Sequence, residues 1–289
     1  MTTTELLKKV RRIEIKSKGL SQQMFAGQYH SAFKGRGMSF SEVRNYQYGD
    51  DVRNIDWNVT ARTGETHVKV FEEERELTLM LMVDISRSAF FGTRGQLRSE
   101  LLTEICATLA FSAGQNNDKV GLMLFSDRVE MYIPPKKGRS HLLRIIRELL
   151  ETKPKGKGTD IGKALDFFVE ILKKPSICFL LSDFLGKGFE KTLGIAARRH
   201  DVIGLHVYDP SEKELPKLGL IRAEDAETGR EQWLDTNSKQ VRERYQQEIA
   251  DNWAYAQNAF RLAQADLLSM ASTEDYVREL RRFFESRRK

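Results

Sequence analysis

The sequence predicts an α/β protein whose core is a doubly wound, mainly parallel β-sheet. Short, nearly unbroken apolar runs recur along the chain, at residues 77–83, 120–125, 177–181 and 202–207. Runs of this length and composition are typical of strands buried on both faces of a sheet. Segments with the helical spacing of apolar residues lie between them, and strands that alternate with helices form parallel sheets through right-handed crossovers.

The first 75 residues lack this alternation. They are polar and contain several glycines, and we expect residues 39–70 to form a few short extended pieces packed on a sheet. We therefore divide the chain into three parts. These are an N-terminal irregular or β segment at 1–75, the α/β domain at 76–236, and C-terminal helices packed on that domain at 237–289.

In the first half of the α/β domain, the predicted order of elements is strand, helix, strand, strand. After the strand at 77–83, the four-residue spacing of leucine, isoleucine and alanine predicts a helix over 96–113. A buried strand follows at 120–125. Residues 129–133 alternate between apolar and polar side chains and then meet two prolines, which is typical of a half-exposed edge strand paired antiparallel to its neighbour.

The second half repeats the pattern of helix and strand. We expect helices around 142–150, 161–172 and 189–199, separated by a glycine- and lysine-rich loop at 153–160 and by strands at 177–181 and 202–207. Residues 218–221 and 232–234 predict a hairpin at the sheet edge. A long amphipathic helix spans 241–260, and a last helix begins at the cap-like segment Ser272 to Asp275.

Composition narrows the classes of protein that the chain can represent. Of its 289 residues 40% are hydrophobic and 30% charged, which predicts a folded core. No apolar run approaches 18 residues, and the N-terminus lacks the apolar centre of a signal peptide. The two cysteines, Cys106 and Cys178, lie in apolar segments, so we expect no disulfide. These features favour a cytoplasmic protein without a transmembrane segment.

The net charge of +6 does not by itself indicate a nucleic-acid partner. Lysine and arginine alternate with acidic residues along most of the chain. The basic clusters lack the interleaved aromatic residues with which strands stack bases. We therefore expect no nucleic acid among the partners and keep nucleic-acid binding only as an alternative function.

Polar side chains follow two of the buried strands and precede one helix. Asp84, Ser86 and Ser88 come directly after the first strand, Thr159 lies in the loop before a helix, and Asp183 follows the third buried strand. Ligands bind at the carboxyl edge of open α/β sheets. Oxygen ligands of this kind suit magnesium. The alternative is three separate helix caps, made by Ser88, by Thr159 or the adjacent aspartate, and by Asp183; their convergence at one edge favours a metal site.

The order and strand contexts of these five residues resemble the metal-ion-dependent adhesion site of von Willebrand factor A domains. The resemblance implies a von Willebrand factor A-like fold in which the hydroxyls of Ser86, Ser88 and Thr159 ligate magnesium or manganese. It also implies that Asp84 and Asp183 act directly or through water. In that family an acidic side chain from a protein partner completes the coordination shell.

Residues 35–57, continuing to Ala61-Arg62, resemble the signature of the bacterial family labelled "domain of unknown function 58". Its members carry this segment just before a von Willebrand-like domain, and the resemblance covers about residues 20–289. Many members have N-terminal membrane helices, which this chain lacks. Genes of the family often neighbour those of MoxR-type AAA+ ATPases, which implies a chaperone-like or adaptor role.

The signature is dense in arginine, aspartate and aromatic residues. We expect it to form a partly buried ion network with aromatic packing anchors, because arginine–carboxylate forks fix geometry; direct binding of a partner is the alternative. The residues concerned are Arg44, Tyr46, Asp50, Asp51, Arg53, Asp56 and Trp57.

The sequence thus favours a non-enzymatic, metal-dependent protein-interaction module. Its expected partner is a MoxR-type AAA+ ATPase, or a client of one, that offers an acidic side chain to the metal. A metal-dependent hydrolase that uses the same carboxylates is an alternative. Serine and threonine ligands with no general base nearby argue against hydrolysis, and the chain has neither a complete P-loop nor paired metal-binding histidines.

Overall fold

The computed structural model describes residues 8, 10–17, 38–73, 76–86, 98–156, 158–224 and 231–287. Its centre is a six-stranded sheet with the order β10-β7-β6-β3-β4-β5, in which only β5 runs antiparallel to its neighbour. The predicted fold class is therefore confirmed. The strands are β3 (Thr78–Asp84), β4 (Lys119–Phe125), β5 (Val129–Lys136), β6 (Ile177–Ser182), β7 (Asp201–Tyr208) and β10 (Asp266–Ala271).

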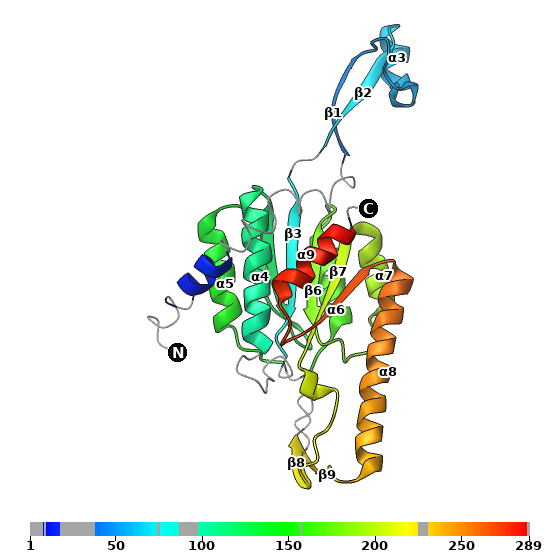
Figure 1. Cartoon of the computed structure of the whole chain (residues 1–289). Helices are drawn as coiled ribbons and strands as arrows, with labels where there is room; N and C mark the ends of the chain where they lie inside the picture. The colour runs from blue at the N-terminus through cyan, green and yellow to red at the C-terminus, as the bar shows by residue number, and fades with distance from the viewer. Residues whose placement is uncertain are drawn as a thin grey trace.

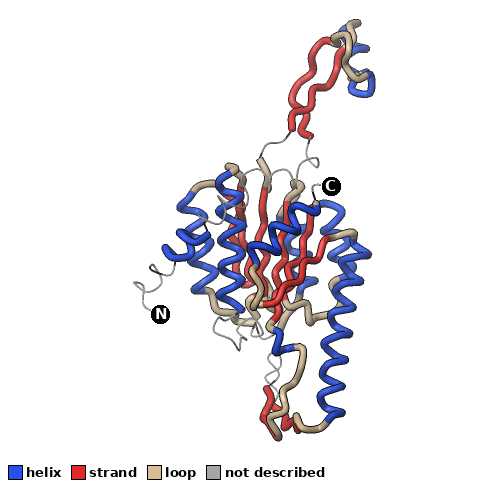
Figure 2. Tube along the Cα trace, viewed as in Figure 1, coloured by secondary structure: helices blue, strands red, loops and turns tan. Residues whose placement is uncertain are grey.

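Helices cover both faces of this sheet (Figure 2). The alternation of side chains along a strand explains the two layers. Leu79 and Leu81 of β3 face one core, and Met80 and Met82 face the other. The first core is closed by α4 (Arg98–Gln115), α5 (Arg139–Glu151) and α9 (Tyr276–Ser286), and the second by α6 (Ile161–Ile171), α7 (Glu190–Arg199) and α8 (Lys239–Ala263).

The edge of the sheet beside β7 differs from the prediction. The expected hairpin is present as β8 (Leu220–Glu224) and β9 (Glu231–Asp235), but it forms a separate two-stranded sheet. β10, which the sequence analysis missed, pairs in parallel with β7 instead. The cap of α9 is Asp275 alone, whose side chain accepts a hydrogen bond from the Val277 N–H at 3.0 Å.

The opposite edge follows the prediction more closely. β5 pairs antiparallel with β4, as expected, but it continues through Pro134 and Pro135 to Lys136. The register between the two strands shifts in this region, between Val120 and Leu122. Proline is tolerated on an edge strand because no further strand needs its missing N–H.

The N-terminal signature forms an arm rather than short pieces packed on the main sheet. β1 (Met38–Asn45) and β2 (His67–Glu73) pair antiparallel, and the chain between them forms η1 (Val52–Asn54) and α3 (Trp57–Thr63). Figure 1 shows this arm at one end of the molecule and β8–β9 at the other. Gly64 ends α3 with a φ of 77°, a conformation that favours glycine.

Two further expectations concern membranes and cysteines. Among the helices that the structure describes, none combines the length and the apolar composition needed to cross a membrane. Cys106 and Cys178 are both free thiols in the core. Burial raises the pKa of both thiols, so neither is activated as a thiolate nucleophile.

Candidate functional site

The loops that carry the predicted metal ligands meet at the carboxyl edge of the sheet. The Ile85 N–H, just after β3, donates to the Phe125 carbonyl at the end of β4 at 2.9 Å. The N–H of Asp160, the residue after Thr159, donates to the carbonyl of Ser126, the residue after Phe125, at 2.9 Å. Because β6 pairs with β3 on its other side, Asp183 also lies at this edge. The topology therefore brings together three loops that are distant in sequence.

Asp84 is the most deeply buried carboxylate of the site, with 2% of its surface exposed. One carboxylate oxygen accepts the Ser86 N–H at 2.9 Å, and the other accepts the Ser182 hydroxyl at 2.8 Å. Burial, and then the negative charge of Asp183, raise the pKa of Asp84 to about 7. A bound cation would relieve both effects by favouring the charged form. Ser182 was missed in the sequence because it ends an apolar run just before the more conspicuous Asp183.

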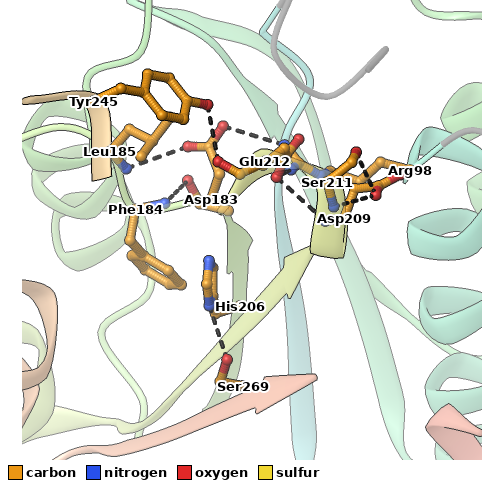
Figure 3. A network of polar contacts seen from close by, with 11 residues as sticks. Arg98, Asp183, Phe184, Leu185, His206, Asp209, Ser211, Glu212, Tyr245 and Ser269 are labelled. Carbon is orange, nitrogen blue, oxygen red and sulfur yellow. Dashed lines mark hydrogen bonds and ion pairs between the residues drawn. The ribbon is translucent and has the colours of Figure 1, made fainter. Parts of the chain in front are cut away.

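Asp183 is held by a basic side chain that the sequence analysis did not single out. The Arg98 guanidinium, at the start of α4, lies 3.4 Å from the Asp183 carboxylate and also pairs with Glu212 (Figure 3). The Leu185 N–H donates to the other Asp183 oxygen at 3.3 Å. Glu212 belongs to the short helix η3 (Pro210–Glu212), which follows β7. Burial raises the pKa of Glu212 despite its arginine partner.

Thr159 carries the observation that best distinguishes a metal site from a helix cap. The Asp160 side chain caps α6 by accepting the Lys163 N–H at 2.9 Å. The Thr159 hydroxyl oxygen is buried, yet it has no hydrogen-bond partner among the described residues. A Cβ built on Gly186, three residues after Asp183, would lie 3.9 Å from the Thr159 carbonyl, so the two loops are adjacent. A buried hydroxyl without a partner is costly unless a ligand satisfies it.

The remaining predicted ligands are two serines. Ser86 is fully buried beside Asp84. Ser88 lies outside the described residues. The part of the chain that the structure describes holds no cluster of three histidine, cysteine, aspartate or glutamate side chains suited to a metal. The donor set is therefore one of hydroxyls and two carboxylates, which fits a hard cation such as magnesium or manganese.

The signature residues of the arm form local contacts rather than one buried network. Arg44 binds both oxygens of Asp50, at 2.8 and 2.7 Å, and this pairing lowers the pKa of Asp50. Asp56 is buried and caps α3 through the N–H groups of residues 58 and 59, at 3.0 and 3.2 Å. Asp51 caps η1 and pairs with Arg53 at 3.4 Å on the surface.

The aromatic residues of the signature require a correction. Trp57 was expected to be a packing anchor, but its side chain is 69% exposed at the first position of α3. Tyr46 is half-buried. A helix of seven residues beside a two-stranded sheet offers too little surface to enclose an indole ring, so Trp57 remains in contact with solvent.

Comparisons with known proteins find sequence relatives that are themselves described as uncharacterized. Uncharacterized protein Rv1480 of Mycobacterium tuberculosis is 30% identical over 285 residues, which cover 97% of this chain and 89% of that protein. Protein YeaD of Bacillus subtilis is 28% identical over 131 residues, 45% of this chain and 29% of that one. A solved structure of BatB from Bacteroides thetaiotaomicron matches with 18% identity and a TM-score of 0.48, over 73% of this chain and 98% of that chain.

A second solved structure, the von Willebrand A domain of SpRpn10, matches with 13% identity and a TM-score of 0.37, over 71% of this chain and 93% of that one. Likenesses this distant carry no information on function. The sequence profile of one family, in contrast, matches residues 42–255 of the 289, a span that includes most of the arm, every strand of the central sheet except β10, and much of α8. On this match and on the mycobacterial relative, the chain belongs to the family described as Protein of unknown function DUF58.

Proposed function

We propose that the protein is a non-enzymatic, metal-dependent protein-interaction module. Magnesium or manganese would be held at the carboxyl edge of the sheet by Asp84, Ser86, Ser88, Thr159 and Asp183. The observation that carries this proposal is the buried Thr159 hydroxyl, which has no hydrogen-bond partner within the described part of the chain and lies at the same edge as two buried carboxylates. A divalent cation there would supply one positive centre for an incoming acidic group.

The donor set indicates what kind of partner would complete the site. Serine and threonine hydroxyls are neutral, and Asp183 already shares its negative charge with Arg98, so the charge of the cation is only partly offset. A bound divalent cation therefore retains affinity for one further anionic oxygen, as from aspartate or glutamate on a protein. The family resemblance suggests a MoxR-type AAA+ ATPase, or one of its clients, as the protein that presents this side chain.

Hydrolysis is the less favoured use of the same residues. Asp84, with its pKa near 7, is the group whose titration would suit a general base. Its side chain is almost completely buried, and both of its oxygens already accept hydrogen bonds from Ser86 and Ser182. With both oxygens already engaged, Asp84 is poorly placed to take a proton from a nucleophilic water, so we expect no turnover of generic phosphoesters in magnesium.

A binding experiment with purified proteins tests the proposal. We expect the MoxR-type ATPase of the same organism to bind the immobilised wild-type chain in magnesium and to dissociate in a chelator. Ser86→Ala and Thr159→Ala should lose binding while keeping wild-type thermal melts. Glu76→Gln is a matched control, because Glu76 pairs with Lys119 and Lys137 at the opposite end of the sheet. A complex that forms equally well in chelator would contradict a metal-mediated contact.

A further inference from the structure

The loop that carries Thr159 is fastened to the neighbouring edge strand by one carboxylate. Glu130 of β5 accepts three hydrogen bonds on a single oxygen. Two come from the N–H groups of Lys155 and Gly156, at 2.9 and 2.7 Å, and the third comes from the Ser126 hydroxyl at 2.7 Å. The loop thus has a fixed point three residues before Thr159.

A second fixed point lies directly after Thr159. The Asp160 N–H donates to the Ser126 carbonyl at 2.9 Å, and the Asp160 side chain caps α6. The same Ser126 therefore contacts Glu130 through its hydroxyl and Asp160 through its carbonyl. Hydrogen bonds at Gly156 and at Asp160 thus flank Thr159 on both sides and restrict where its backbone can lie.

Gly156 shows how closely the loop approaches β4 and the turn that follows. A Cβ on Gly156 would lie 2.1 Å from the Asp127 carboxylate oxygen and 2.2 Å from the Ser126 hydroxyl oxygen. No other residue type fits without displacing these groups. The close approach is what allows the Gly156 N–H to reach Glu130.

The hydrogen bonds to Glu130 are made to a charged acceptor. Burial acts to raise the pKa of Glu130, but the hydrogen bonds from Gly156, Ser126 and Lys155 outweigh it and lower the pKa. The side chain is therefore a carboxylate near neutral pH, and hydrogen bonds to ionised acceptors are about twice as strong as neutral ones. The Thr159 hydroxyl, in contrast, has no hydrogen-bond partner among the described residues, so its position depends on the backbone of the loop.

We propose that Glu130 is a positioning residue for the metal site, and that it acts by fixing the loop so that the Thr159 hydroxyl meets the cation. The inference rests on the proposed function, since it assigns Glu130 a role in the same site. Glu130 itself does not ligate the metal in this scheme. Residues that orient metal ligands typically change metal affinity by 10- to 100-fold when they are replaced.

Manganese titration by calorimetry tests the proposal in the full chain. Glu130→Ala should weaken manganese binding by roughly 10- to 100-fold. Glu130→Gln keeps an acceptor oxygen but loses the charge, so its loss should be smaller. In a Thr159→Ala background, Glu130→Ala should change the affinity little further, because the two residues act through one ligand. Glu76→Ala, which removes a carboxylate at the far end of the sheet, should bind like wild type.

Amide hydrogen exchange without metal gives a second measurement. The amides of residues 155–160 should exchange faster in Glu130→Ala than in wild type, while the amides of α4 stay protected. If Glu130→Ala does not fold, the same measurement is made on Glu130→Gln, in which exchange should also be faster than in wild type. Unchanged exchange in this loop would overturn the proposal. A second result would also overturn it. If Glu130→Ala weakens manganese binding as much in the Thr159→Ala background as in wild type, the substitution acts through a general loss of structure and not through Thr159.

The results separate this inference from the proposed function. If wild type binds manganese, Asp84→Asn does not, and Glu130→Ala binds like wild type, then Glu130 does not position the site, but the metal-dependent module stands. If wild type binds no manganese, both proposals are wrong.

Discussion

The guanidinium of Arg98 lies 3.4 Å from the carboxylate of Asp183, and both side chains are buried although 85 positions separate them in the sequence. Arg98 also pairs with Glu212, so it connects the loop after β6 to the short helix after β7. Asp183 therefore has a positive neighbour whether or not a cation is bound. The stability of the site therefore depends on the positive charge that balances the carboxylates of Asp183 and Glu212.

Arg98→Gln should destabilise the fold, and magnesium should reduce the deficit. The variant leaves the Asp183 and Glu212 carboxylates without the guanidinium, and breaking a buried ion pair costs about 3–5 kcal/mol. A bound cation would supply part of the missing positive charge to Asp183. Thermal melts of wild type and variant, each with chelator and with saturating magnesium, measure the effect. An equal deficit in both conditions would show that no cation reaches Asp183.

Acid should destabilise the protein partly through His200. This residue is 3% exposed, and neither ring nitrogen has a hydrogen-bond partner among the described residues. Burial, together with the charge of Arg199, lowers the pKa of His200 from 6.5 to about 4. Between these two values the unfolded chain binds a proton that the folded chain does not, so stability is present above pH 6.5 and is lost as the pH falls toward 4.

Replacement of His200 by phenylalanine isolates this contribution. The ring packs against Phe168, with centroids 4.4 Å apart, so an aromatic substitute keeps most of the packing. Urea unfolding of wild type and His200→Phe, at pH 7 and at pH 4.5, should show a smaller loss of stability in the variant. Parallel losses in the two proteins would mean that His200 does not contribute.

The arm should tolerate the loss of its tryptophan better than the loss of its cap. Trp57 is 69% exposed, so Trp57→Ala should change local stability by less than about 0.5 kcal/mol. Asp56 is buried and accepts two N–H groups of α3, so Asp56→Ala should cost about 0.5–2 kcal/mol. Hydrogen exchange of residues 57–63 reports this region directly. Faster exchange in Trp57→Ala than in Asp56→Ala would show that the indole packs after all.

The sheet was predictable because its central strands are buried on both faces. β3, β4, β6 and β7 therefore consist of apolar runs that stand out from the surrounding sequence. β10 was missed because it is an edge strand of six residues that is only partly buried. The arm was missed because α3 has seven residues and no buried side chain, so no apolar periodicity marks it.

The residues of the candidate site also fall into two groups, those that the sequence identified and those that it did not. Asp84, Ser86 and Asp183 were found because each follows a recognisable strand, and parallel strands end at one edge. Arg98 was not found, because its partners lie 85 and 114 positions away and no local pattern connects them. Glu130 has the position of an ordinary polar residue in an alternating edge strand. Its role depends on a loop that folds back onto it.

Magnesium binding to this edge of the sheet is the central claim, and calorimetry on metal-free protein tests it most directly. Asp84→Asn keeps the shape of the side chain and removes its charge, which makes it the matched comparison for wild type. We predict that magnesium binds wild type and that Asp84→Asn binds it at least tenfold more weakly, since each 1.4 kcal/mol of lost attraction is about a factor of ten. A thermal melt similar to that of wild type would show that the variant is folded. Equal binding by the two proteins would contradict the assignment of the site.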